Sequence, residues 1–247
     1  MKSKQLIFPF ILQAFFFAGI FFCENLFAQA PVISLEDSLI NTFNKRIDPQ
    51  VKLFNGVAYL GYFGKQEGNA YLDNNPDFVK GTVTYDGYTF KNVPILFDLV
   101  EDKVVSLLYN GYSKYSFLSE RLSNFTINGR TFVYIPLGKP EDGGAKKAGF
   151  FEVPYEGKIK VLIKRTKSIK ELLEIQGITK QFSEGVEYFI MRDHQLYKVN
   201  GESAFIRLFE NHKEELKKYL KSNKLKFRQD PVKTLVSLAS YYEQLSN

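Results

Sequence analysis

The side chains best suited to catalysis are few in this chain, and they do not fall into a catalytic pattern. The sequence contains two histidines, His194 and His212, and a single cysteine, Cys23. They lack the close spacing of zinc motifs such as H-E-x-x-H. No serine lies in a G-x-S-x-G nucleophile elbow, and no glycine-rich phosphate loop is present. The residues therefore predict no metal, no cofactor and no catalytic residue.

A second pattern resembles the first half of a calcium-binding loop. Asp73, Asn75 and Asp77 have the alternating spacing of the first calcium ligands. However, Phe78 stands where the loop needs glycine, and Thr84 stands where it needs a bidentate glutamate. The motif therefore predicts a polar turn and not a cation site.

Aromatic residues offer a candidate binding surface. Tyr109, Tyr112 and Tyr115 bracket the Asn110-Gly111 turn, and exposed tyrosines can stack on sugars or contact peptides. The chain contains no tryptophan, which weakens the case for a carbohydrate platform. Tyrosine is also common in strands, where it packs across the sheet. Both interpretations of these three residues stay open at this point.

A basic stripe offers a second candidate surface. Lys213, Lys217, Lys221 and Lys224 recur on one side of an expected helix, and the basic excess of the chain lies in residues 157–247. Such a stripe can contact anionic headgroups or an acidic partner. Neighbouring glutamates favour the alternative of an ordinary solvated surface. Nucleic acid is not expected as a partner of an exported protein.

The elements that must position these residues predict an α+β fold. Residues 34–47 carry one apolar face and a capping-box pattern, which predicts a short N-terminal helix. Residues 51–199 contain short runs rich in β-branched and aromatic residues, the first of them at 51–62, separated by turn signals such as Asn128-Gly129. This spacing predicts an antiparallel β-meander: a curved sheet, a sandwich or a partly closed barrel. The β domain would span residues 29–200.

The pattern changes to a helical period after Asn200-Gly201, which predicts a C-terminal helical segment, 201–247, packed on the sheet. Ser203 and Asn211 are expected to cap its first two helices, and Asp230-Pro231 is a strong start for the last one. A further short helix, opened by Ser168 and ended at Gly177, would interrupt the strands.

The start of the chain indicates export. Lys2 and Lys4 precede an apolar run, 6–22, and small residues follow up to Ala28. This order is typical of a secretory signal peptide, 1–28, cleaved near Ala28. An uncleaved membrane anchor and lipid attachment at Cys23 are the alternatives. The expected location is the periplasm or the cell surface, and the remaining chain would contain no cysteine.

Several stretches resemble a group of signal-peptide-bearing exported proteins of Bacteroidetes-type bacteria for which no activity is known. The resemblance rests on residues 81–87 (GTVTYDG), 96–102, 149–162 and 217–242, and it covers most of the chain after the leader. It implies an envelope location. It carries no catalytic residues to this chain.

These observations predict a non-catalytic envelope protein that binds a partner protein or a surface polymer, with an anionic membrane surface as another partner. The alternative is a periplasmic carrier that encloses a lipid or other apolar ligand between sheet and helices. A third hypothesis is a hydrolase built from scattered carboxylates such as Glu101 and Asp102, which otherwise look like turn residues.

Overall fold

Tight two-residue turns organise the centre of the sheet. In the computed structural model, which describes residues 50–136, 148–175 and 177–246, Asp86 and Gly87 both have positive φ (50° and 79°), as do Asn128 and Gly129 (51° and 73°). Turns of this kind match the twist of the strands that they join. They connect β3 (Val79–Tyr85) to β4 (Tyr88–Asp98), and β7 (Leu122–Ile127) to β8 (Arg130–Ile135). The hairpin predicted at Asn128-Gly129 is therefore confirmed.

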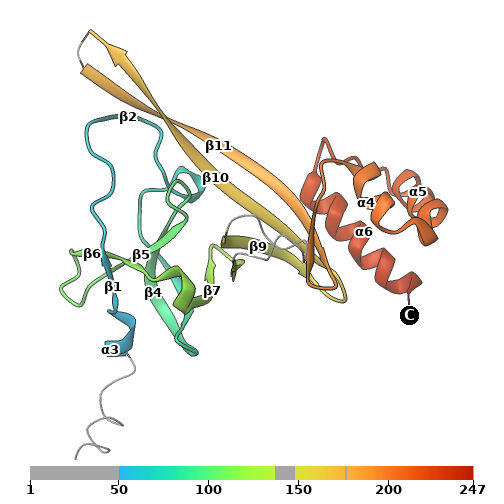
Figure 1. Cartoon of the computed structure of the whole chain (residues 1–247), viewed down its shortest axis with the longest axis horizontal. Coiled ribbons are helices and arrows are strands. Elements are labelled where there is room, and N and C mark those ends of the chain that lie inside the picture. Colours follow the sequence, from blue (N-terminus) through green and yellow to red (C-terminus); the bar gives the residue numbers. More distant parts are fainter. Residues whose placement is uncertain (1–49, 137–147, 176, 247) are drawn as a thin grey trace, which may run out of the picture. The chain divides into compact units, whose positions relative to one another are not determined.

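The described residues contain one curled sheet of twelve strands, with helices mainly at the C-terminal end (Figure 1). These residues belong to a single compact unit, Asp48–Asn247. Most neighbouring strands are antiparallel and follow the order β1-β6-β5-β4-β3-β7-β8-β9-β10-β11-β12. The remaining strands are β1 (Gly56–Ala58), β2 (Lys65–Glu67), β5 (Lys103–Leu107), β6 (Lys114–Phe117), β9 (Gly149–Glu156), β10 (Lys160–Glu174), β11 (Gly177–Arg192) and β12 (Gln195–Lys198). The α+β class is confirmed.

The sheet is mixed, which corrects the prediction of a purely antiparallel meander. Strand β2 pairs in parallel with β11, with Lys65 opposite Thr179. Its sequence, KQE, has no apolar alternation and all three residues are exposed. The pairing depends on the backbone and on polar contacts such as the ion pair between Lys65 and Glu174 (2.7 Å). A strand of this kind gives no periodic signal in the sequence.

The short helix expected from Ser168 through Ile175 is wrong, because residues 168–174 belong to strand β10, in the outer half of a long hairpin. Strands β10 and β11 stay in register from Lys160 opposite Met191 to Glu174 opposite Gly177. A helix cap at Ser168 would contribute about 1 kcal/mol. The hairpin instead gives every residue from Ser168 to Glu174 a cross-strand partner and brings Phe182 against Tyr62, with ring centroids 5.5 Å apart. The tertiary pairing therefore outweighs the local signal.

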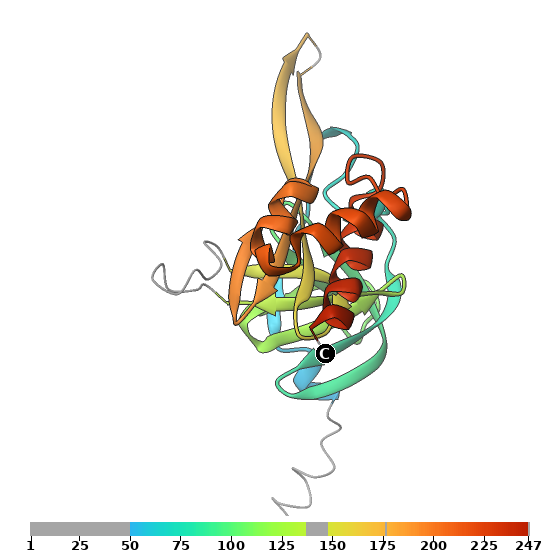
Figure 2. The same cartoon turned by 90° about the vertical axis from the view of Figure 1, so that its right-hand side faces the viewer.

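The C-terminal helices pack beside one end of the β10–β11 hairpin, and the hairpin turn lies at the other end (Figure 2). They are α4 (Glu202–Leu208), α5 (Lys213–Ser222) and α6 (Pro231–Leu245), and α6 contacts β9 and β10. The Asp230 side chain accepts a hydrogen bond from the Lys233 amide (2.9 Å), so this predicted cap is confirmed. The caps predicted at Ser203 and Asn211 are wrong, because Gly201 and His212 occupy those positions without side-chain caps.

The first described element is a helix and not a strand. Helix α3 (Gln50–Leu53) occupies the start of the strand predicted at 51–62, directly after the sequence Asp48-Pro49, a common helix-start pattern. Short 3₁₀ turns are η1 (Leu72–Asn74), η2 (Ser119–Arg121) and η4 (Glu210–His212). The predicted signal peptide and the helix at 34–47 lie outside the described residues. Among the described helices, none is long and apolar enough to cross a membrane.

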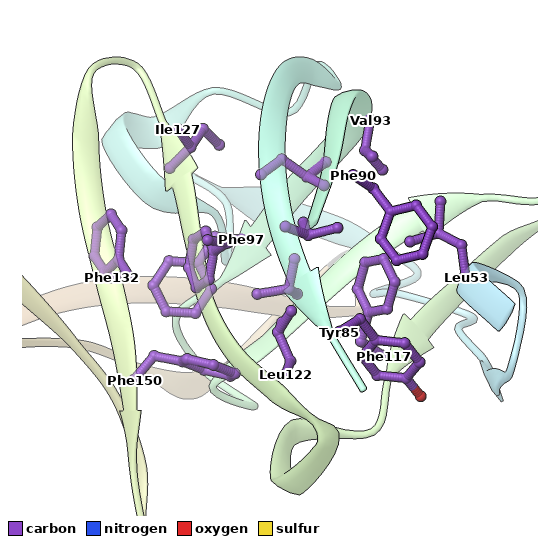
Figure 3. Packing of buried hydrophobic residues seen from close by; sticks show 14 of the residues in the cluster. Leu53, Tyr85, Phe90, Val93, Phe97, Phe117, Leu122, Ile127, Phe132 and Phe150 are labelled. Atoms are coloured by element: carbon purple, nitrogen blue, oxygen red, sulfur yellow. The ribbon is translucent and has the colours of Figure 1, made fainter. Parts of the chain in front are cut away.

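A phenylalanine cluster forms the main core. Phe97 lies 5.0 Å from Phe125, 5.2 Å from Phe132 and 5.9 Å from Phe150 between ring centroids, with edge-to-face geometry in each case (Figure 3). Phe125 and Phe132 stack at 4.9 Å. These four rings come from β4, β7, β8 and β9, so the cluster links strands across the middle of the sheet. A second cluster lies between the helices and the ends of β10 and β11.

We expect Phe97→Ala to lower the free energy of unfolding by about 3–5 kcal/mol, because it removes a ring that touches three others in a closed core. Urea denaturation followed by circular dichroism measures this. Phe63→Ala is the matched control, since Phe63 is 69% exposed and its loss should change the same quantity by less than about 0.5 kcal/mol. Equal losses in the two variants would contradict the assignment of Phe97 to the core.

Candidate binding site

A hollow of about 580 Å³ lies beside the first half of β4. One wall consists of seven consecutive residues, 88–94, and the opposite wall consists of 106–108 with Gly111. Leu53 and Phe54, at the end of α3, line it as well. We call this feature the β4 hollow. Its volume lies within the range of pockets that bind small molecules or peptide segments.

The β4 hollow exists because β4 and β5 diverge. The two strands pair only from Ile95 opposite Ser106 to Asp98 opposite Lys103. Before Ile95, the register between β3 and β4 shifts at Asn92, which has positive φ (59°) and forms a bulge. A bulge bends its strand and increases the local twist. The start of β4 therefore pairs with β3 on one side. On the side of β5, no strand among the described residues pairs with it.

The chemistry of the β4 hollow is mainly apolar. Leu53, Phe90 and Val93 are buried members of the main core (labelled in Figure 3), and Leu108 is partly buried against it. The hydroxyl of Ser106 donates to the Pro94 carbonyl (2.7 Å), so this polar group is already satisfied. The hollow thus offers a concave apolar surface that joins the core of the sheet.

Two tyrosines adjoin the β4 hollow, Tyr88 in its lining and Tyr109 against the lining residue Phe54, and this is not the set predicted. Tyr109 and Tyr112 are 87% and 77% exposed, and Tyr109 meets Phe54 edge-to-face at 6.3 Å. Tyr115 is only 2% exposed and donates its hydroxyl to the Leu53 carbonyl (2.8 Å), so it belongs to the core and not to the predicted surface. The reason is register: Tyr115 starts the inward alternation of β6, whereas Tyr109 and Tyr112 lie in the turn. Tyr88 is the rim tyrosine that the prediction of this site omitted.

A lysine bound to Tyr88 places positive charge at the rim. The ammonium group of Lys52 lies 4.2 Å from the centre of the Tyr88 ring and donates to its hydroxyl (3.1 Å). Lys91 is exposed on the same wall, and it is the one charged residue in the lining. Tyr88 follows the Asp86-Gly87 turn, which is the signal that could have placed it at the exposed end of β4.

The predicted lysine stripe lies on α5 and the loop after it. Lys217, Lys221 and Lys224, together with Lys226, surround a shallow hollow of about 390 Å³ that also contains Leu220 and Leu225. Lys213 is exposed at the start of α5 and is not part of this lining. We call the lined surface the lysine hollow. It lies at the carboxyl end of a helix, where cations also stabilise the helix dipole.

A third exposed surface is the end of the β10–β11 hairpin. Leu173 and Ile178 are cross-strand partners that are 88% and 53% exposed, and Ile175 is fully exposed next to the turn. Isolated apolar residues on a surface are ordinary, but this hairpin end carries three exposed aliphatic side chains, two of them directly opposite each other. The sequence analysis, which expected a helix here, could not identify it.

Asp98 is the most buried acid among the described residues, and its partners give it a structural role. Asp98 is fully buried, and its Oδ2 accepts hydrogen bonds from the hydroxyls of Tyr59 (2.7 Å) and Tyr62 (2.8 Å). Its Oδ1 accepts from the amides of Val100 (2.8 Å) and Glu101 (3.1 Å). Burial raises the pKa of both tyrosines well above the usual value, and hydrogen bonds add to this effect, from Tyr71 and Asp98 for Tyr59 and from Asp98 for Tyr62. Four protein donors satisfy this carboxylate inside the fold.

The remaining candidates for chemistry are held in turns. Asp73 pairs with Arg130, and the Asn75 side chain accepts from the Asp77 amide (3.0 Å), so this loop is organised by protein contacts. His194 lies in the exposed turn between β11 and β12, and His212 packs against Tyr242 (5.7 Å). Within the described ranges, no three histidine, cysteine or acidic side chains are grouped so that they could hold a metal ion.

The carboxylates of the hydrolase hypothesis also have basic partners. Glu101 pairs with Lys103 (2.7 Å), and Asp102 pairs with Lys164 (2.6 Å). Both acids lie in the turn between β4 and β5, as the sequence indicated. Comparisons of the chain with family models, with curated proteins and with solved structures found no match.

We expect the free energy of unfolding to fall as the pH rises above about 10, because the folded protein keeps the phenolic protons of Tyr59 and Tyr62 at a pH where the unfolded chain releases them. In Tyr59→Phe this alkaline slope should be shallower. The variant should also lose about 1–3 kcal/mol at pH 7, because Asp98 loses a buried donor. Urea denaturation between pH 7 and 11 measures both effects.

The control for this experiment is Tyr109→Phe, which removes an exposed hydroxyl and should match the natural protein at every pH. Lys167, whose pKa burial lowers, contributes a slope of opposite sign, since stability rises as its proton is lost. Lys167 is present in the natural protein and in both variants, so its contribution to the slope cancels when they are compared. An unchanged alkaline slope in Tyr59→Phe would contradict the role assigned to Tyr59.

We expect the purified protein to sediment with phosphatidylglycerol vesicles at low salt and the triple variant Lys217→Glu, Lys221→Glu, Lys224→Glu to remain in the supernatant. Each lysine near an anionic surface contributes about 1 kcal/mol, so reversing three should remove the interaction. The control reverses three exposed lysines elsewhere, Lys80, Lys114 and Lys170, for the same change in net charge. Equal sedimentation of both variants would contradict a specific role for the lysine hollow.

Proposed function

We propose that this chain is an exported, non-catalytic protein of the cell envelope that binds a partner protein in the β4 hollow. The observation that carries the proposal is the open apolar hollow with two exposed tyrosines at its margin: Tyr88, which lines it, and Tyr109, which contacts the lining residue Phe54. Protein interfaces are enriched in tyrosine and bury apolar pockets at their centre. A surface with these properties is costly to leave in water, so a partner that covers it gains free energy from its burial.

The exported location in this proposal rests on the sequence. The basic start, the apolar run 6–22 and the small residues up to Ala28 are typical of a signal peptide. After cleavage near Ala28, the protein would reside in the periplasm or at the cell surface. Its cysteine-free remaining chain would depend on core packing, and the phenylalanine cluster around Phe97 is suited to that demand.

The alternative function, a carrier of a lipid or other apolar ligand, would also use the β4 hollow. Phe97, Phe125, Phe132 and Phe150 occupy the centre of the main core and pack against one another. A ligand would therefore lie in the open hollow and not among these rings. An open surface next to exposed tyrosines favours a protein partner, because an enclosed site would shield an apolar ligand from water more completely.

The test is site-specific photo-crosslinking in cells of the protein's own host. With a benzoylphenylalanine at Tyr109, we expect a crosslinked species larger by the mass of a partner protein. The matched control carries the same probe at Arg207, an exposed residue of α4. Mass spectrometry identifies the adduct.

The outcomes separate the two functions. A protein adduct at Tyr109 that is absent at Arg207 supports the proposal. An adduct of lipid size at Tyr109 would overturn it in favour of the carrier. Identical adducts at the two positions, or none at Tyr109, would contradict a partner site at the β4 hollow.

A further inference from the structure

We propose that the partner binds the β4 hollow as an extended segment that adds a strand to the free edge of β4. This inference rests on the proposed function of the hollow and specifies the mode of binding and the chemistry of the partner. An extended peptide that pairs with an open sheet edge obtains its affinity from main-chain hydrogen bonds and its specificity from alternate side chains.

The composition of the wall is the first argument. Side chains of a strand alternate between the two faces of a sheet, so a pocket on one face is lined by every second residue. The β4 hollow is lined by all of the residues 88–94 in succession. Only the backbone edge of a strand presents consecutive residues to one space. The hollow therefore runs along the edge of β4.

The hydrogen-bonding pattern of the β3–β4 hairpin is the second argument. Tyr85 and Tyr88 close a two-residue turn, and pairing continues with Val83 opposite Phe90. In such a hairpin these residues exchange bonds with the facing strand, while the residues between them point their backbone groups outward. The N–H and C=O groups of Thr89 and Lys91 therefore face the β4 hollow, where no described strand pairs with them.

The boundaries of this edge limit what can bind. Natural proteins protect open edges with charged side chains, especially lysine, and with bulges. Here Lys91 is exposed on the edge, and the bulge at Asn92 ends the regular part of the edge. A long strand of another molecule therefore cannot pair past Asn92 without a shift in the pairing register. The site is suited to a short extended segment and disfavours open-ended association between copies of this chain.

The surroundings define the chemistry of that segment. Alternate side chains on the core side would contact Leu53, Phe90, Val93 and Leu108, which requires apolar residues at every second position. The charges at the rim are the ammonium groups of Lys91 and Lys52. Charge complementarity therefore favours an acidic residue next to the apolar positions. The inferred partner is a protein with a short, extended, alternately apolar segment flanked by an acidic side chain.

The experiment uses peptides selected against the purified protein from a phage-displayed library of random dodecamers. We expect the selected peptides to alternate apolar residues and to slow hydrogen exchange at the amides of Thr89 and Lys91. Thr89→Pro removes the outward N–H and fills the edge with a ring, so it should weaken binding about tenfold or more. Thr89→Val keeps the backbone donor, so it should weaken binding far less than Thr89→Pro does.

A second measurement does not depend on the folding of a proline variant. The selected peptide is resynthesised with N-methyl groups at alternate positions, which blocks strand pairing and leaves its side chains in place. One of the two methylation patterns should weaken binding about tenfold or more, and the other should have little effect.

Leu108→Asp distinguishes this inference from the proposed function. It places a charge in the β4 hollow and should abolish peptide binding if the hollow is the site. Loss of binding in Leu108→Asp, with full binding to Thr89→Pro and to both N-methylated peptides, would overturn strand addition and support the hollow as a site. If no peptide is selected, or if Leu108→Asp binds normally, both proposals are wrong.

Discussion

The fold depends on two oppositely charged, buried side chains: Lys167, which ties the long β10–β11 hairpin to the loop before β3, and Asp98, which ties the end of β4 to the segment between β1 and β2. The ammonium group of Lys167 donates to the carbonyls of Asn69 (2.8 Å) and Tyr71 (2.7 Å) and to Oδ1 of Asn74 (2.6 Å). Its backbone amide donates to the Leu99 carbonyl (3.0 Å). Burying a charge without partners would cost several kcal/mol. The loop through Asn69–Asn74 is therefore constrained to supply oxygens to Lys167.

Asp98 completes this arrangement from the other side. It accepts hydrogen bonds from the hydroxyls of Tyr59 and Tyr62, which lie between β1 and β2. The Leu99 carbonyl accepts from the Lys167 amide, and the Leu99 amide donates to the Ala70 carbonyl (2.9 Å). Burial lowers the pKa of Lys167, and the carboxylates of Glu184, Asp73 and Asp98 act in the opposite direction. These contacts fix the end of β4 firmly. Among the described residues, the start of β4 pairs with β3 on one side and has no strand on the other, so the two ends of this strand differ in how they can respond to a partner.

Local chemistry in the sequence was sufficient to predict the elements whose geometry is decided within a few residues. The Asn128-Gly129 turn and the Asp230-Pro231 helix start need only their own φ values and side chains, and both are confirmed. The α+β class follows from the change of hydrophobic period after Asn200-Gly201, because packing against one core requires that period.

The predictions that failed concern features decided by distant residues. Strand β2 has no apolar pattern, and residues 168–174 become strand only because residues 177–183 lie opposite them. The β4 hollow was not predictable for the same reason. It requires a bulge at Asn92, divergence of β5 and the placement of α3, and none of these has a local signature. Tyr115 is an example. Tyr112 and Tyr115 both follow the Asn110-Gly111 turn closely in the sequence, and only the register of β6 turns the Tyr115 side chain inward.

The position of the β4 hollow follows from the same constraint that stabilises the fold. Because Asp98 and Lys167 fix one end of β4, the bulge at Asn92 can separate that end from the free edge without loosening the core. The outward groups of Thr89 and Lys91 are then held on a rigid strand, which lowers the entropy that a bound segment must overcome. A flexible edge would lose this advantage, and a fully paired edge would leave no donors. Within the described part of the chain, the first half of β4 has an edge without a strand partner and the second half is fixed on both sides, and strand addition requires this combination.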